Sequence, residues 1–339
     1  MKSRSVMSLS KNMLFIILLI LVGMMSRPAF ALEKISFMTD WRAEAEQGGF
    51  YQAKVDGTYA RFGLDVTILQ GSPQTNNLLL LAAKKIDFSI ASNIIAVLNA
   101  AQNNVPITAV AAIFQKDPVV LLTHPNVGLD NFQDLTKATA YVATGGLNSF
   151  YVWLKKAYGF RSEKTKPYNF NSVPFIADNK SIQQGILTSE PFIIQKNSNF
   201  TPNVFLLWDY GYGSYGSIIE TRNDLIKKNP DLVQRFVDAS IIGWYNYLYG
   251  DNSAANEAIK KDNPEMTNEQ IAYAIKVMKE KGIVDSGDAS KLGIGVITDE
   301  RFRRFVTTMT DSGVVPKTTD FSNSYTTKFT GKEIGRRQN

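Results

Sequence analysis

Apolar and polar residues follow two different spacings along the chain after residue 32. Leu64, Val66 and Ile68 alternate with polar or charged neighbours, and this period of two predicts a β-strand. Between such stretches, apolar residues recur with helical spacing. In this first part, strands are expected at 35–38, 64–71, 86–92 and 107–114, and helices at 48–57, 72–85 and 93–104. The repeated strand–helix order predicts an α/β fold with a mostly parallel sheet and helices on both faces.

The strand–helix order starts again near residue 119. Strands are expected at 119–125, 138–144 and 203–211, and helices at 129–135, 145–160 and 179–187. Residues 188–196 begin either a strand or a helix, and a strand from 217 continues into a long amphipathic helix and a mostly helical tail. The restart predicts two lobes. Lobe one comprises 32–122 and 217–339 with its C-terminal helices, and lobe two comprises 123–216.

Residues 1–31 have the layout of a secretory signal peptide. Basic residues precede an apolar, uncharged run at 13–25, and Ala29 and Ala31 occupy the small-residue positions before a cleavage site. The run is shorter than the roughly 20 residues that a membrane-spanning helix needs. We expect cleavage after Ala31 and a periplasmic product, the alternative being an uncleaved membrane anchor.

The overall charge changes once the expected signal peptide is removed. Its loss takes four basic residues and lowers the count from 37 to 33, against 31 acidic residues. A net charge so close to zero gives no basic surface for nucleic acid or an anionic membrane. Residues 32–339 exceed the length of one typical hydrophobic core, which agrees with two lobes.

The residue inventory excludes several kinds of enzyme. The chain has no cysteine and one histidine, His124, which precedes Pro125, so thiolate chemistry is impossible. No G-x-S-x-G motif accompanies that histidine, and His, Cys and carboxylates are not spaced for a metal. Residues 145–149 (GGLNS) lack the lysine and the spacing of a phosphate-binding loop. We therefore predict no catalytic residue, metal or cofactor, and a structural role for His124.

Candidate ligand contacts follow the ends of the predicted strands. Trp41 comes directly after the first strand, and Tyr210 belongs to the aromatic, glycine-rich stretch 208–216. The carboxyl ends of parallel strands line the crevice where open α/β sheets bind ligands. The helix start at 145–149 offers free N–H groups to a small polar ligand, although it also fits a plain helix cap. Polar candidates are Gln47, Gln74, Ser92, Asn93, Gly145, Asn148 and Ser149.

Glu190 stands at the entry of an apolar segment, in the sequence TSEPFII. A buried carboxylate without a partner costs several kcal/mol, so such an acid needs a reason. It could be a catalytic acid, a metal ligand, an ion-pair partner or a contact for a bound ligand.

The stretch 48–92 resembles the opening of periplasmic solute-binding proteins that serve ABC importers. The resemblance is to the subfamily named for thiamine-pyrimidine-precursor synthesis and binding, whose cousins bind nitrate, sulfonates and taurine. Lys84 stands where the family usually has a glycine. The matching segments are 57–59 (GTY), 63–66 (GLDV), 85–88 (KIDF), 127–135 (VGLDNFQDL) and 224–239.

The resemblance implies a type II periplasmic binding protein, with two α/β lobes that close on a ligand in the cleft between them. It also implies a monomeric receptor that delivers a hydroxymethylpyrimidine-like ligand to a membrane permease and its ATPase. Trp41 takes the place of a tryptophan that stacks on the pyrimidine, and Glu190 that of an acid that pairs with its amino group. A carboxylate suits this role because it accepts from an amino N–H. Gln47 replaces a histidine common in relatives, which weakens the case for phosphorylated or formylated ligands.

Three alternatives stay open on the sequence. The ligand could be a sulfonate, taurine or another small anion, for which only Arg42 and the turn at 145–149 offer donors. The protein could be an enzyme like the fungal relatives that make the pyrimidine, but these use iron, histidine and a cysteine-rich stretch. Glu190 could form an ion pair between the lobes.

Overall fold

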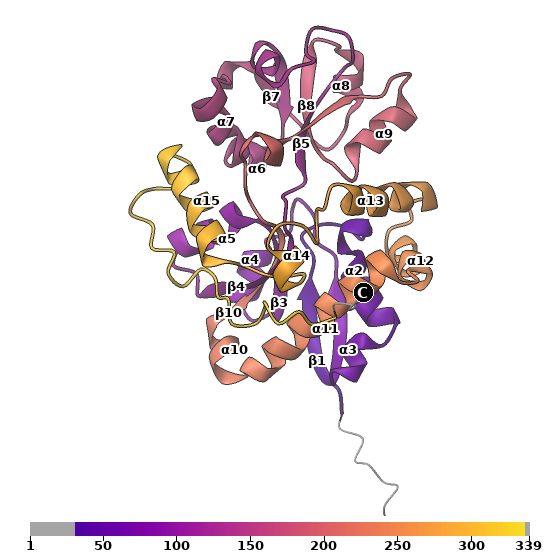
Figure 1. Ribbon diagram of the computed structural model, residues 1–339, viewed down its shortest axis with the longest axis vertical. Coiled ribbons are helices and arrows are strands. Elements are labelled where there is room, and N and C mark those ends of the chain that lie inside the picture. Colours follow the sequence, from indigo (N-terminus) through magenta and orange to yellow (C-terminus); the bar gives the residue numbers. More distant parts are fainter. Residues whose placement is uncertain (1–30, 336–339) are drawn as a thin grey trace, which may run out of the picture.

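The computed structural model describes residues 31–335, which form two α/β lobes, one above the other in Figure 1. The signal peptide expected at 1–31 lies, except for Ala31, outside the described residues. Lobe one contains a five-stranded sheet in the order β2-β1-β3-β10-β4. Its strands are β1 (Glu33–Met38), β2 (Leu64–Leu69), β3 (Phe88–Asn93), β4 (Ile107–Phe114) and β10 (Gly216–Arg222).

Lobe two contains a second sheet in the order β7-β6-β8-β5-β9. Its strands are β5 (Val119–Thr123), β6 (Thr139–Val142), β7 (Thr165–Pro167), β8 (Ser181–Ile186) and β9 (Asn203–Leu206). In each sheet one strand runs against the others: β10 is antiparallel to β3 and β4, and β5 is antiparallel to β8 and β9. Both reversed strands follow a crossover between the lobes. The expected α/β fold with mostly parallel sheets is therefore confirmed.

The first crossover lies slightly earlier than the sequence indicated. All of β5 pairs within the second sheet, so residues 119–122 belong with lobe two and not with the first part of lobe one. Every residue of β5 is buried, as in β4, so its hydrophobic pattern does not reveal which sheet it joins. The chain crosses between the lobes at 115–118 and again at 211–215.

Glycines allow two helices of lobe one to pack closely on the sheet. Helix α2 (Gly48–Val55) crosses α11 (Pro230–Tyr249), and a Cβ at Gly48 or Gly49 would lie 2.1–2.2 Å from the rings of Tyr247 and Trp244. Only glycine fits where a helix backbone approaches a ring so closely. The segment that precedes α2 is thereby held against the lobe, and it carries part of the candidate site.

The other helices cover the two sheets and the side of the molecule (Figure 1). Helix α13 packs against α9 of lobe two and so joins the lobes. Lobe one includes α3 (Thr58–Arg61), α4 (Asn77–Ala82), α5 (Ile94–Gln102), α10 (Asn223–Lys228), α12 (Ser253–Asp262), α13 (Asn268–Glu280), α14 (Ala289–Leu292) and α15 (Asp299–Asp311). Lobe two includes α6 (Thr144–Leu147), α7 (Phe150–Tyr158), α8 (Val173–Ala177) and α9 (Glu190–Asn197). Short 3-10 turns are η1 (Ala45–Gln47), η2 (Phe132–Lys137), η3 (Ser162–Lys164) and η4 (Leu207–Tyr210).

Several predicted helices differ from the structure. The segment 179–187 is the central strand β8, because it pairs with β6 and β5 on its two sides. Helix α4 begins at Asn77 instead of Ser72, since the Asn76 side chain caps it by accepting from Leu79 N at 3.0 Å. The helix expected at 145–160 is divided into α6 and α7, and Glu190 begins a helix, not a strand.

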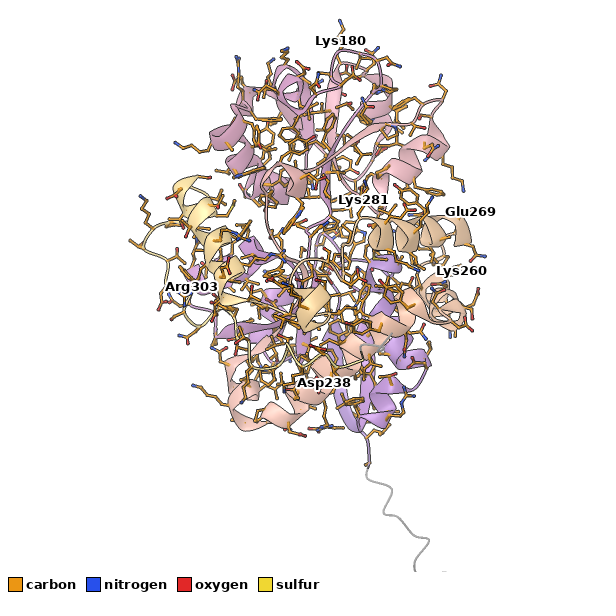
Figure 2. All side chains as sticks on the ribbon, viewed as in Figure 1. Lys180, Asp238, Lys260, Glu269, Lys281 and Arg303 are labelled. Atoms are coloured by element: carbon orange, nitrogen blue, oxygen red, sulfur yellow. The ribbon has the colours of Figure 1, made fainter. Side chains whose placement is uncertain are left out.

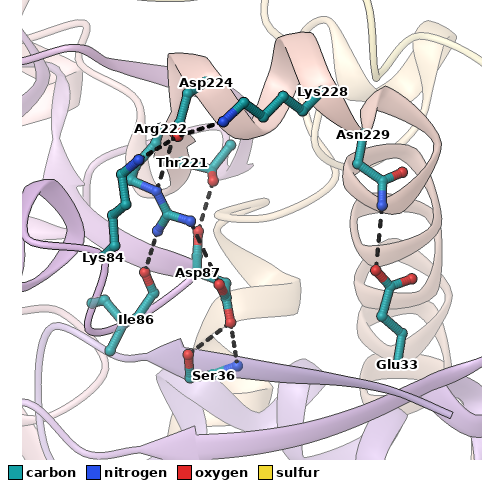
Figure 3. Close-up of polar contacts among 10 residues, drawn as sticks. All are labelled: Glu33, Ser36, Lys84, Ile86, Asp87, Thr221, Arg222, Asp224, Lys228 and Asn229. Carbon is teal, nitrogen blue, oxygen red and sulfur yellow. Dashed lines mark hydrogen bonds and ion pairs between the residues drawn. The ribbon is translucent and has the colours of Figure 1, made fainter.

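A polar network closes the end of the first sheet opposite to the carboxyl ends of β1 and β3 (Figure 3). Arg222 is buried at the end of β10, donates to the Ile86 carbonyl and pairs with Asp224 at 3.2 Å. Asp87 accepts from Ser36 N at 2.9 Å and from its hydroxyl at 2.7 Å. The buried Arg222 guanidinium is thus paired and hydrogen-bonded, as burial requires. They fix β1, β3 and β10 to one another away from the cleft.

No helix within residues 31–335 is long and apolar enough to cross a membrane.

Candidate functional site

The carboxyl end of β1 leads into a short segment that carries three acids. Asp40, Glu44 and Glu46 lie between β1 and α2, and the segment is tied to lobe one by side chains. The Gln70 amide oxygen accepts from Ala43 N at 2.8 Å, and Asn263 donates to the Ala43 carbonyl at 2.9 Å. The acids therefore occupy fixed positions at the edge of the sheet.

A fourth carboxylate, Glu190, comes from lobe two, and the four are called the cleft carboxylates below. Glu190 begins α9, where a negative charge is favoured at the helix N-terminus. Its Oε1 accepts from the Tyr168 hydroxyl at 2.9 Å, and its Oε2 accepts from Ile186 N at 2.7 Å. Gly185 leaves room for this side chain, because a Cβ there would lie 2.9 Å from the Glu190 Cβ.

The cleft carboxylates act on one another across the lobes. Thr188 of lobe two donates its hydroxyl to Glu46 of lobe one. Burial raises the pKa of Glu44 well above its ordinary value, and the charges of the other three cleft carboxylates raise it further. Burial also raises the pKa of Glu46, with a contribution from the charges of Glu190 and Asp40. The pKa values of these carboxyl groups are therefore coupled through their charges.

Hydrogen bonds from neutral groups only partly offset the burial of the other two acids. Burial raises the pKa of Asp40, although Ser92 donates its hydroxyl to Asp40 Oδ2 at 2.8 Å. Burial raises the pKa of Glu190 as well, against the bonds from Ile186 and Tyr168. The site is thus rich in carboxyl groups whose charged forms burial disfavours.

Aromatic rings from both lobes lie beside the carboxylates. The Trp41 ring of lobe one meets the Phe170 ring of lobe two at a centroid distance of 4.8 Å and an angle of 52°. Phe170 in turn contacts Tyr168 at 5.5 Å, and Tyr168 holds Glu190. Trp41 and Glu190, chosen together from the sequence, are therefore joined through two rings. Phe170 is 50% exposed and so remains available for contact.

A hollow of about 440 Å³ opens beside these rings on lobe two. Its volume falls within the range of small-molecule sites. Glu190 and Tyr168 form part of its wall, which places the acid and its partner at an accessible surface. The lining residues are Tyr168, Phe170, Asn171, Ser172, Val173, Ile176, Glu190, Ile193 and Asn197.

The lobes touch on the other side of the site through α13 and α9. The Tyr273 hydroxyl donates to the Leu187 carbonyl at 3.2 Å, and the Tyr273 and Phe192 rings lie 5.3 Å apart. Lys196 pairs with Glu269, the residue labelled on α13 in Figure 2, at 3.3 Å. Together with the contact of Trp41 with Phe170, these interactions hold the lobes in a closed arrangement.

Two polar candidates from the sequence also reach this site. Gln47 is buried, its Oε1 accepts from Glu44 N at 3.0 Å, and its hydrogen bonding lowers the pKa of Asp40 against the larger effect of burial. Ser92 is exposed and donates to Asp40. Trp41, Gln47, Ser92 and Glu190 are thus brought together around the cleft carboxylates.

The other candidates have different surroundings. Asn93 caps α5 by accepting from Ala96 N at 3.2 Å, and Gln74 is exposed in the loop before α4. The Tyr210 ring stacks on Phe132 of lobe two at 3.7 Å. In the turn at 145–149, Ser149 donates to the Gly145 carbonyl at 2.7 Å, while Gly145 and Asn148 are exposed. None of the contacts described here joins these residues to Trp41 or Glu190.

Sequence reasoning missed several residues of the site. Asp40, Glu44 and Glu46 lie within seven positions directly after the first strand, and this density of acids was a usable signal. Tyr168 and Phe170 follow the edge strand β7 in an irregular segment, where no periodic pattern marks them. Thr188 is equally inconspicuous.

His124 has the surroundings of a structural residue. It is buried, its Nε2 lies 2.8 Å from the Phe175 carbonyl, and its ring stacks on Phe200 at 4.0 Å. Across residues 31–335, no three His, Cys, Asp or Glu side chains are grouped so that they could hold a metal ion. The cleft carboxylates are therefore too dispersed to form an ordinary metal site.

Comparison with known proteins agrees with this architecture. The chain is 23% identical over 308 residues to the riboflavin-binding protein RibY of Chloroflexus aurantiacus, covering 88% of this chain and 86% of that protein. It is 24% identical to 4-amino-5-hydroxymethyl-2-methylpyrimidine phosphate synthase THI11 of Saccharomyces cerevisiae, covering 70% and 73%. The periplasmic aliphatic sulphonate binding protein SsuA of Escherichia coli superposes with a TM-score of 0.65 at 13% identity, covering 86% and 91%.

The similarity to SsuA shows that the fold is that of periplasmic binding proteins. The family model described as NMT1/THI5 like matches residues 44–255, which is more than half of the chain and includes parts of both lobes. This protein is a member of the NMT1/THI5-like family.

Proposed function

We propose that this protein is the solute-binding component of an ABC import system. It captures a small aminated heteroaromatic molecule, a thiamine pyrimidine precursor of the hydroxymethylpyrimidine type, in the cleft between its lobes. It then delivers this ligand to a permease and its ATPase in the inner membrane. The fold of periplasmic binding proteins supports the transport role, and membership of the NMT1/THI5-like family supports the choice of ligand.

The observation that carries the proposal is the line of contacts from Trp41 through Phe170 and Tyr168 to Glu190. Aromatic faces from both lobes suit a flat ring, and stacking adds about 0.5–1.5 kcal/mol beyond the buried area. Each Glu190 oxygen accepts one bond from the protein, and a carboxylate has about four lone-pair sites in all. Glu190 can therefore also accept from the amino group of a ring.

The charge of the site argues against a sulfonate or another small anion. Such a ligand would face four carboxyl groups, each of which repels an anion when it is ionised. Arg42, the cation that the sequence offered, is exposed and pairs with Glu265 at 3.0 Å. The SsuA fold is thus shared, while the residues of this cleft favour a different ligand.

A receptor also fits the residues better than a pyrimidine-synthesising enzyme. The chain contains no cysteine, and its single histidine is enclosed by Phe175 and Phe200. The identity to THI11 is 24% over 70% of the chain, which leaves room for a change of activity. Periplasmic localisation follows from the signal-peptide layout of residues 1–31, and a secreted product with an N-terminus at Leu32 would test it.

Thermal unfolding and calorimetry with 4-amino-5-hydroxymethyl-2-methylpyrimidine test the proposal. Ligand at 100 times its dissociation constant should raise the unfolding free energy by about 2.7 kcal/mol. Taurine and an alkanesulfonate serve as the competing ligands. A thermal shift with a sulfonate and none with the pyrimidine would overturn the proposed ligand.

A further inference from the structure

Within residues 31–335, the cleft carboxylates have no basic counterion. The ion pairs within residues 31–335 join other acids to lysine or arginine, and none includes Asp40, Glu44, Glu46 or Glu190. Their side-chain hydrogen-bond donors are neutral: Ser92 and Gln47 for Asp40, Trp41 for Glu44, Thr188 for Glu46 and Tyr168 for Glu190, which also accepts from the Ile186 amide. Neutral donors satisfy single oxygens but supply no positive charge. In the Arg222 network, by contrast, the acids have a cation beside them.

A buried carboxylate oxygen without a partner lies next to this cluster. Asp117, on the first crossover, is 5% exposed; its Oδ1 accepts from Val119 N at 3.1 Å, and its Oδ2 has no hydrogen-bond partner. A Cβ at Gly216 would lie 3.5 Å from the Asp117 Cα and 3.4 Å from the carbonyl of Ser92, whose hydroxyl holds Asp40. The Asp117 backbone therefore lies near that of Ser92, and the charge of Asp40 adds to the effect of burial in raising the pKa of Asp117. Buried polar atoms normally have a partner, so an external donor is expected here.

The neighbouring aromatic rings restrict the kind of cation that fits. A metal ion prefers several oxygen ligands at short distances, and no such group is present among the described side chains. Trp41 and Phe170 border the carboxylates, and ring faces attract organic cations. An ammonium group also supplies N–H donors, which the spare carboxylate oxygens can accept.

We propose that the ligand is an aromatic amine with a positively charged ammonium group on a short side chain, which Asp40, Glu44 and Glu46 bind while Glu190 accepts from the ring. This inference rests on the proposed function, from which it takes the ring. The ammonium group serves as the missing counterion. Because the acids come from both lobes, it also removes the repulsion between them when the cleft closes.

A pair of nearly isosteric ligands tests the inference on the intact mature protein. 4-Amino-5-aminomethyl-2-methylpyrimidine carries an ammonium group where 4-amino-5-hydroxymethyl-2-methylpyrimidine carries a neutral hydroxyl. We expect the amine to bind about thirtyfold more tightly in calorimetry at neutral pH, as one charge-assisted contact allows. Raising the salt concentration should reduce this preference, since screening weakens the charged contact.

Glu44→Gln removes one charge at nearly constant shape. It should lower the preference for the amine to about fivefold or less. Glu265→Gln is the matched control, because this exposed acid pairs with Arg42 on the surface. It should keep the full preference. Circular dichroism of each variant checks that it is folded.

The outcomes separate the two proposals. Equal affinity for the amine and the hydroxymethyl compound, or a preference that Glu44→Gln leaves intact, would overturn the ammonium site while the pyrimidine receptor stands. Binding of neither compound would overturn the proposed function and this inference with it. The comparison of the two ligands on the unmodified protein needs no variant, so it decides the matter even if Glu44→Gln does not fold.

Discussion

Glu220 allows a quantitative prediction about how folding depends on pH. It lies in β10 in the middle of the first sheet, is 4% exposed, and accepts a hydrogen bond from the Ser89 hydroxyl at 2.9 Å. Burial raises the pKa of Glu220 from 4.5 to about 7, and the bond from Ser89 offsets only part of this effect. The carboxyl group is therefore protonated in the folded protein at pH values where the unfolded chain has lost the proton.

The sign of the pH dependence follows from proton binding. Between 4.5 and about 7 the folded state binds more protons at Glu220 than the unfolded state does. Its contribution to stability is thus fully present below pH 4.5 and is lost as the pH rises through 7. The difference between these two pKa values corresponds to roughly 3 kcal/mol of unfolding free energy.

Glu220→Gln should abolish this loss, because the amide oxygen still accepts from Ser89 but cannot ionise. Urea unfolding of the ligand-free protein at pH 4.5 and pH 8 measures the effect. Relative to the unmodified protein, we expect the variant to gain about 2–3 kcal/mol more at pH 8 than at pH 4.5. Glu300→Gln, an exposed surface change, should give no such difference. If the unfolding free energies of Glu220→Gln and of the unmodified protein changed equally with pH, this reasoning would be refuted.

Three further predictions concern the site and the hinge. Glu190→Gln should weaken binding of 4-amino-5-hydroxymethyl-2-methylpyrimidine at least about tenfold in calorimetry, and Trp41→Ala should cause a similar loss. Tighter binding of a sulfonate by Glu190→Gln would contradict the proposal that the ligand is a pyrimidine. Gly185→Ala should weaken the same ligand by about tenfold, because its Cβ would displace Glu190, and unchanged affinity would show that the position of Glu190 is unimportant. Arg301 donates to Gln115 on the first crossover, so Arg301→Lys should lower the unfolding free energy in urea by about 1–3 kcal/mol. Arg303→Lys, at an exposed position, should not lower it. Equal stabilities of the two variants would show that Arg301 does not stabilise the crossover.

The two-lobed fold could be predicted because short strands and helices alternate and the order restarts at 119. Where prediction failed, neighbours in space decided the structure. Residues 181–186 (SIQQGI) contain two glutamines and a glycine, which is a weak strand signal, yet they form the centre of the second sheet. Strands β4 and β5 are buried along their whole lengths, so their own patterns did not show which sheet each one joins.

Two residues of the candidate site could be proposed from the sequence. Trp41 and Glu190 were chosen from their places at the ends of elements and from family resemblance, and the structure joins them through Phe170 and Tyr168. The choice of Tyr210 shows the limit of that reasoning, since its ring packs on Phe132 within lobe two. An aromatic residue after a strand faces the cleft or the core according to a turn geometry that residue type does not determine.

Arg301 contacts both of the segments by which the chain crosses between the lobes. Arg301 of α15 donates to Gln115 at 3.1 Å on the first crossover, and its guanidinium lies 3.8 Å from the centroid of the Tyr215 ring on the second. If the cleft opened by separating the two crossovers, one of these contacts would be lost. We therefore expect the lobes to rotate about an axis close to Asp117. Asp40 and Asp117 would then keep their positions in the open protein, while Glu190 moves away from Trp41.

A charged ligand should first meet the acids of lobe one, which makes the association rate sensitive to salt. Ring contacts form on closure, so Trp41→Ala should act mainly on the dissociation rate.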